Sequence, residues 1–155
     1  KVFTTCGNKQ LGAMPGIAVV GIRKDCLQEI KVDKSFSYVN LFTHLMFMKD
    51  NQTPTTASTI LFENLLDAVE SFDPVENEKK IKTNSKLLSE AFGSYVIGEK
   101  CCPVITVKRE AVPLDVAKKW QLYGVNSGAE TYQFFTYNGT EEEYKNFLED
   151  SKMYP

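Results

Sequence analysis

The residues that could carry catalysis are few, and the single histidine is the first to consider. Any catalytic histidine or multi-histidine zinc site would have to centre on His44. No G-x-S-x-G, G-x-x-x-x-G-K-[ST], G-x-G-x-x-G or C-x-x-C motif occurs, so the commonest hydrolase, nucleotide-binding and thioredoxin signatures are missing. His44 lies among Phe42, Leu45 and Met46, a setting typical of a hydrogen-bonded core or pocket histidine. We therefore predict no catalytic residue, no metal site and no cofactor.

Four cysteines offer a different chemistry, that of disulfide formation. A bond between the neighbours Cys101 and Cys102 would close a strained ring, so the two remaining pairings both join Cys6 and Cys26 to that pair. Closing a loop of about 100 residues would stabilise the fold by roughly 4 to 5 kcal/mol in the chain-entropy model. The alternative leaves one cysteine of the pair free or bonded to another chain.

Two glycosylation sequons, like cysteines that form disulfides, are typical of extracellular proteins. Asn51 and Asn138 each begin an N-x-T triplet, and together with cysteine pairs they predict a secreted, glycosylated protein. No charged leader followed by an apolar stretch is present, so we expect that a signal peptide has been removed and that Lys1 is a processed end.

Length and charge exclude several classes of protein. The 155 residues suit one domain, predicted to span residues 1–155. Eighteen basic against twenty acidic residues give a net charge of -2, without the basic excess that nucleic-acid binding requires. No apolar run approaches the roughly 20 residues of a membrane span. Neither nucleic acid nor a membrane span is expected.

The first half of the chain predicts strands followed by a helix. Residues 17–22 are apolar and β-branched, which is typical of a buried strand. Residues 35–48 fit both periods, and their alternation favours a strand. Residues 59–72 repeat apolar side chains at helical spacing and predict a helix that ends at Asp73-Pro74. The polar residues 76–86 are expected to run over the surface.

The second half predicts mostly strands. Four short β-rich runs are separated by turn residues, at residues 94–97, 104–109, 118–125 and 131–137. The turn residues 126–128 predict that the last two runs pair as a hairpin.

A helix is predicted after the last strand. Thr140 and Glu143 form a capping box, and the acidic triplet Glu141-Glu142-Glu143 suits a helix start better than a calcium site. Tyr144, Phe147 and Leu148 provide its apolar face.

Aromatic side chains gather on the two strands expected to form that hairpin. One face of the pair could line a pocket with rings, or the same rings could simply fill the core. The residues concerned are Trp120, Tyr123, Tyr132, Phe134, Phe135 and Tyr137.

The order of these features resembles the lipocalins. The resemblance rests on a strand that opens after Gly16-Ile17-Ala18, at the place of the family's G-x-W box, on serial antiparallel strands, on the cysteines and on a late amphipathic helix. It implies a mainly β fold, an antiparallel up-and-down barrel with a C-terminal helix. It also implies an extracellular carrier that holds one small hydrophobic or amphipathic ligand. The expected ligand-binding residues are Phe42, His44, Met46, Trp120, Leu122 and Phe134.

A second hypothesis places the chain in another class. The helix predicted at residues 59–72 favours a secreted α+β interaction domain, such as an inhibitor or immune modulator, with helices on one face of an antiparallel sheet. An enzyme whose site leaves no sequence signal is the third alternative.

Overall fold

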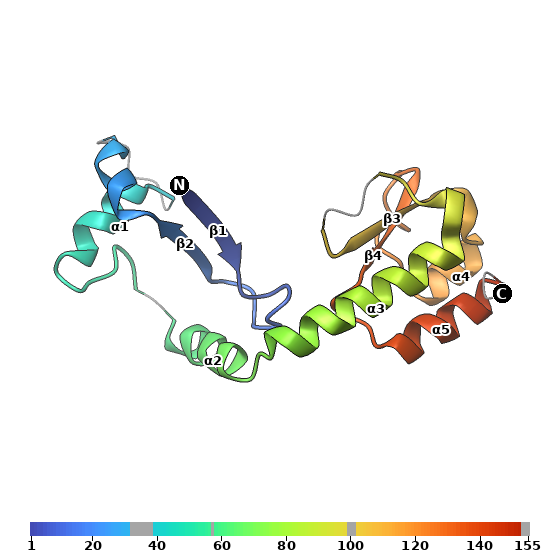
Figure 1. Ribbon diagram of the computed structural model, residues 1–155. Coiled ribbons are helices and arrows are strands. Elements are labelled where there is room, and N and C mark those ends of the chain that lie inside the picture. Colours follow the sequence, from blue (N-terminus) through green and yellow to red (C-terminus); the bar gives the residue numbers. More distant parts are fainter. Residues whose placement is uncertain (32–38, 57, 99–101, 153–155) are drawn as a thin grey trace. The chain divides into compact units, whose positions relative to one another are not determined.

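The computed structural model describes residues 1–31, 39–56, 58–98 and 102–152, which form an α+β protein (Figure 1). Helices make up 48% of the described residues and strands 16%. The described strands form two separate two-stranded antiparallel sheets. The predicted mainly β barrel is therefore wrong, because a barrel needs a closed ladder of many more strands. Contacts divide the chain into two compact units, Lys1–Phe72 and Asp73–Pro155.

Each unit combines strands with helices. The elements of Lys1–Phe72 are β1 (Val2–Cys6), β2 (Ala18–Ile22), the 3-10 helix η1 (Lys24–Glu29), α1 (Leu41–Met48) and α2 (Thr59–Glu70). Those of Asp73–Pro155 are α3 (Pro74–Phe92), η2 (Gly93–Tyr95), β3 (Val104–Lys108), η3 (Arg109–Ala111), α4 (Leu114–Lys119), β4 (Thr131–Phe135) and α5 (Glu141–Asp150).

A hairpin and a helix organise the unit Lys1–Phe72. β1 pairs with β2, with Thr4 opposite Val20. α2 packs on the loop of this hairpin: the side-chain oxygen of Asn64 accepts a hydrogen bond from the Met14 amide at 2.6 Å. A Cβ on Gly7 would lie 2.7 Å from a Leu65 methyl, so the glycine lets the helix approach the loop closely. The strand predicted at residues 17–22 and the helix predicted at residues 59–72 are confirmed, each ending within two residues of the observed element. The burial expected of that strand is wrong, because Ala18, Val19 and Val20 are exposed.

The strand predicted at residues 35–48 is wrong over the part that the structure describes. Residues 41–48 form α1, and residues 35–38 lie outside the described residues. Asn40 starts the helix: its side chain accepts hydrogen bonds from the amides of Phe42 and Thr43 at 3.0 and 3.3 Å. The dense apolar residues fit both the helical and the strand period. The Asn40 cap therefore favours the helix where the apolar pattern alone does not distinguish the two.

The predicted surface segment at residues 76–86 is helical instead. Asp73 caps α3 by accepting from the amides of Val75 and Glu76, and Pro74 occupies the first helical turn. Asp73-Pro74 therefore follows α2, as predicted, and also begins α3. One face of α3 is buried through Asn84, Leu88 and Phe92, which the sparse apolar pattern of the segment did not reveal.

β3 pairs with β4 in the unit Asp73–Pro155, with Ile105 opposite Phe134. The strands predicted at residues 104–109 and 131–137 are thus confirmed, but the hairpin between residues 118–125 and 131–137 is wrong. Residues 118–125 form the end of α4 and a turn, which shares with β4 a single bridge from Tyr123 to Gln133 and no strand ladder. Residues 94–97 are a 3-10 turn and a bridge, not a strand.

The core of this unit lies between its sheet and its helices. Figure 1 shows α3 and α5 side by side next to the β3–β4 pair. The two strands alternate buried and half-buried residues, so one face meets the helices. The predicted capping box of α5 is confirmed, with Thr140 and Glu143 bonded in both directions. The buried core consists of Leu88, Phe92, Ile105, Val107, Ala111, Val112, Ala117, Tyr132, Phe134, Phe147 and Leu148.

The predicted disulfides are contradicted within the described residues. Cys6, Cys26 and Cys102 all carry free thiols, and Cys101 lies outside the described residues. Cys6 and Cys26 belong to the unit Lys1–Phe72 and Cys102 belongs to the unit Asp73–Pro155, so both predicted pairings would have to join the two units. A disulfide forms only where the Cα atoms lie within about 7 Å of each other.

Candidate functional sites

The six predicted ligand-binding residues fall into two groups of three. Phe42, His44 and Met46 lie on α1 in the unit Lys1–Phe72. Phe42 and His44 are half-buried, and Met46 is exposed, with the Lys49 ammonium 3.8 Å from its sulfur. Trp120, Leu122 and Phe134 lie in the other unit and line one depression. Each group is described here within its own unit.

A stripe of exposed apolar residues is the main feature of α2. Leu61, Asn64, Leu65 and Ala68 are half-buried and form the face toward the hairpin loop. On another side, Phe62, Leu66 and Val69 are 50%, 56% and 52% exposed. Their spacing of four and three residues places them one above another along the helix. We call these three residues the α2 stripe.

Acidic side chains flank the α2 stripe. Glu63, Asp67 and Glu70 are exposed on the same helix, and Thr59–Glu70 contains no lysine or arginine. The helix therefore presents an apolar stripe within a negatively charged surface.

The hairpin adds further exposed apolar surface to the same unit. Val2, Phe3, Val19 and Val20 are all exposed, and the Phe3 ring lies over Gly21, where any Cβ would collide with it. Exposed apolar residues that gather in one region mark interaction sites more often than residues scattered singly.

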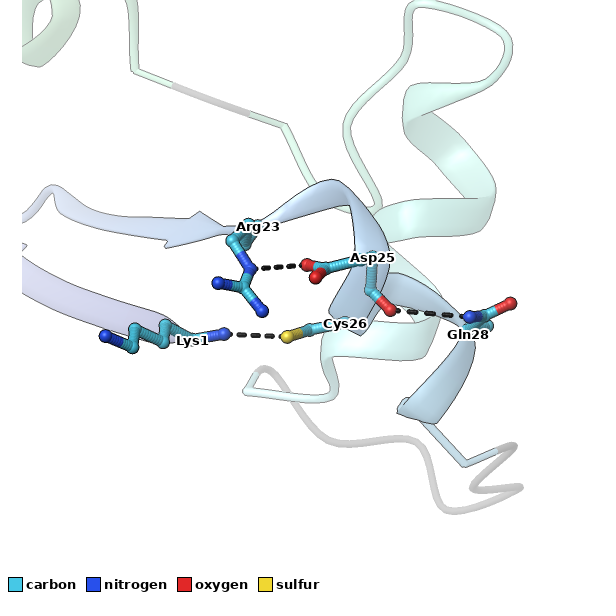
Figure 2. Close-up of polar contacts among 5 residues, drawn as sticks. All are labelled: Lys1, Arg23, Asp25, Cys26 and Gln28. Carbon is cyan, nitrogen blue, oxygen red and sulfur yellow. Dashed lines mark hydrogen bonds and ion pairs between the residues drawn. The ribbon is translucent and has the colours of Figure 1, made fainter.

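Polar contacts link the first residues of the chain to η1, as Figure 2 shows. The Arg23 guanidinium pairs with the Asp25 carboxylate at 2.5 Å, and the α-ammonium of Lys1 donates to the Cys26 sulfur at 2.7 Å. Gln28 donates its amide to the Asp25 carbonyl at 3.5 Å. These contacts are solvent-exposed and join the elements locally.

An aromatic depression of about 490 Å³ lies on the unit Asp73–Pro155. It is formed by the turn after α4, β4, the turn that follows β4, and α5. We call it the aromatic depression. Its lining consists of Trp120, Gln121, Leu122, Tyr123, Gln133, Phe134, Phe135, Asn138, Gly139, Glu143, Tyr144 and Phe147.

Hydrogen bonds and ring contacts fix these aromatic side chains. The Trp120 indole N–H donates to Asp150 at 2.7 Å, and the Tyr144 hydroxyl donates to the Phe135 carbonyl at 2.9 Å. Trp120 meets Phe147 edge to face, with ring centroids 5.7 Å apart. Tyr123 meets Phe135 in the same way at 5.4 Å. The walls of the depression are therefore held in place.

Glu143 supplies the one carboxylate of this lining. The Thr140 amide and hydroxyl donate to it at 2.7 and 3.0 Å and lower the pKa of that carboxyl, so it is ionised at neutral pH. Burial raises the pKa of the Tyr144 hydroxyl, which stays a neutral donor. The described lining contains no lysine, arginine or histidine.

A second depression of about 490 Å³ follows the single loop 118–127. Arg109 holds this loop by donating to the carbonyls of Val125, Ser127 and Ala129, and its guanidinium lies 5.3 Å from the centre of the Tyr132 ring. This second depression is lined by one continuous segment, whereas the aromatic depression lies between several elements. The aromatic depression is therefore the better candidate for a ligand-binding site.

The two sequons occupy exposed turns. Asn51 has a positive φ of 53° after α1, and Asn138 lies on the rim of the aromatic depression after β4. Glycosylation at either asparagine stays a prediction.

Within the described ranges, no three histidine, cysteine or acidic side chains are grouped to hold a metal ion. No helix among the described residues is long and apolar enough to cross a membrane.

No protein-family model, curated protein or solved structure matches this chain. These comparisons do not bear on the resemblance to the lipocalins, whose implied barrel the two small sheets contradict.

Sequence reasoning predicted three of the twelve residues that line the aromatic depression. It named Trp120, Leu122 and Phe134, but for the inner face of a barrel. It missed Gln133, Asn138 and Glu143 as lining residues, since only the position of α5 brings them to the same place. The α2 stripe could have been predicted from the sequence. The apolar residues of the helix at residues 59–72 cover a wider arc than packing against one neighbouring element would bury.

Proposed function

We propose that this chain is an extracellular protein-interaction domain whose α2 stripe inserts into an apolar groove on a partner protein. The observation that carries the proposal is the stripe itself: Phe62, Leu66 and Val69 are at least half exposed at the i, i+4, i+7 spacing of a groove-binding helix. The two sequons support the extracellular compartment.

The stripe is large enough to contribute to a specific complex. Full burial of an exposed side chain of this kind is worth roughly 1.5 to 3 kcal/mol, and because each of the three is about half exposed, each contributes up to about half of that. The three anchors together offset part of the cost of association. The opposite face of α2 already packs on the hairpin loop through Leu61, Leu65 and the Asn64–Met14 hydrogen bond. The helix is thus held by its own unit before it meets a partner.

Charge indicates what the rim of the groove carries. Glu63, Asp67 and Glu70 flank the stripe, and no basic residue on α2 balances them. We expect lysine and arginine at the edge of the partner groove, which speeds association and makes it sensitive to salt. The same acidic residues disfavour an anionic membrane surface as the occupant, because such surfaces attract basic segments.

Site-specific crosslinking tests the proposal. A photo-reactive amino acid at Leu66 should crosslink one partner in the native extracellular fluid, and the affinity for that purified partner is then measured by calorimetry. Leu66→Glu should weaken the complex at least about 100-fold, as expected for a central anchor.

Leu114→Glu is the matched control, because Leu114 is 49% exposed on α4 of the other unit. It should leave the affinity unchanged. Equal losses for both variants, or none for Leu66→Glu, would show that α2 does not form the interface.

A further inference from the structure

We infer that the aromatic depression of Asp73–Pro155 binds a small amphiphile with an apolar ring body and a positively charged head. This site lies in a different unit from the α2 stripe and does not depend on the proposed protein partner.

Size and lining set the body of the ligand. A volume of about 490 Å³ falls within the range of small-molecule sites, roughly 300 to 1,000 Å³. The walls are rings from three different segments: Trp120 and Tyr123 after α4, Phe135 on β4, and Tyr144 on α5. A flat apolar group can stack on such rings with little loss of its own freedom.

Charge sets the head of the ligand. Glu143 contributes a carboxylate to the lining, and Glu141 and Glu142 precede it in the first turn of α5. The lining contains no lysine, arginine or histidine, and two nearby cations have acidic partners: Lys119 pairs with Asp150 and Lys145 pairs with Glu141, each at 2.6 Å. An anionic head would therefore meet the Glu143 carboxylate with no cation in the lining to receive it, whereas a cation is attracted both by Glu143 and by the ring faces.

The rings are positioned before any ligand arrives. Asp150 fixes the Trp120 indole, the Phe135 carbonyl fixes the Tyr144 hydroxyl, and the Thr140 cap fixes the Glu143 carboxylate. Little ordering is then needed on binding, which favours affinity for a small molecule.

Trp120 provides a direct readout, because it is the one tryptophan of the chain. Its fluorescence is titrated with three probes that share a phenylpropyl body: 3-phenylpropylammonium, 3-phenylpropanamide and 3-phenylpropanoate. The cation should bind about tenfold more tightly than the amide, and the anion should bind most weakly. No saturable change with any probe at millimolar concentration, or tightest binding of the anion, would overturn the inference.

Three variants of the full chain assign the contacts. Glu143→Gln keeps an acceptor for the capping box but removes the charge, so the preference for the cation over the amide should fall to near unity. Tyr123→Ala removes a ring that is 63% exposed and should weaken all three probes, while Tyr95→Ala, outside the depression, should change nothing. Far-ultraviolet dichroism confirms that each variant is folded. Retention of the cation preference by Glu143→Gln would refute the proposed role of that carboxylate.

Discussion

The units Lys1–Phe72 and Asp73–Pro155 differ in where their apolar side chains lie. Among described residues, fourteen of the nineteen exposed large apolar residues belong to Lys1–Phe72, whose only buried described residues are Gly7, Ala13 and Asn40. Asp73–Pro155 buries eleven apolar residues in one cluster. The second unit thus has the interior expected of an independent fold, whereas the first leaves most of its large apolar side chains exposed.

The largest expected difference between the two units is in the loss of stability when a phenylalanine is replaced by alanine. Phe92 is 1% exposed in the core of Asp73–Pro155, so Phe92→Ala should lower its free energy of unfolding by about 3 to 5 kcal/mol. Phe62 is half exposed on α2, and Phe62→Ala should change stability by no more than about 0.5 kcal/mol. Hydrogen exchange with mass spectrometry reads each unit separately. Similar losses of protection would mean that Phe62 belongs to a core.

A pair of asparagines sharpens the same comparison. Asn84 is fully buried, and its amide donates to the carbonyls of Thr136 and Gly139, both at 2.9 Å. Asn84→Ala should cost about 2 kcal/mol in urea unfolding monitored by Trp120 fluorescence, because buried carbonyls lose their donors. Asn64 makes the corresponding link in the other unit at a solvent-exposed contact, and Asn64→Ala should lower the stability of Lys1–Phe72 by less than about 1 kcal/mol, measured by hydrogen exchange with mass spectrometry. A larger loss of stability for Asn64→Ala than for Asn84→Ala would contradict the difference in burial between the two asparagines.

The smallest expected effect concerns pH. Hydrogen bonds from Lys119 and then Trp120 lower the pKa of Asp150 below its ordinary value of 3.8. Its stabilising contribution is therefore present above pH 3.8 and is lost as the pH falls through the lower folded-state pKa. Unfolding measured between pH 2 and about 6 should show a shallower acid loss for Asp150→Asn than for the parent chain. Asp25→Asn, at the exposed pair with Arg23, is the control and should leave the slope as it is.

Local signals in the sequence determined several elements correctly. The capping box at Thr140 and Glu143 started α5 as predicted, because a cap involves residues only three apart. The apolar spacing at residues 59–72 predicted α2, and the β-branched runs predicted β2, β3 and β4. Where two periods fitted equally, at residues 35–48, the pattern favoured a strand and the Asn40 cap produced a helix.

The tertiary structure alone decided how these elements pair and what they line. β4 pairs with β3 rather than with residues 118–125, since strand pairing depends on long-range packing that local periodicity does not encode. That pairing places Trp120, Leu122 and Phe134 around a depression shared with α5 instead of inside a barrel. The sequence by itself determined the amphipathic pieces and their caps, and only the fold determined which apolar faces are buried against one another and which remain exposed to bind.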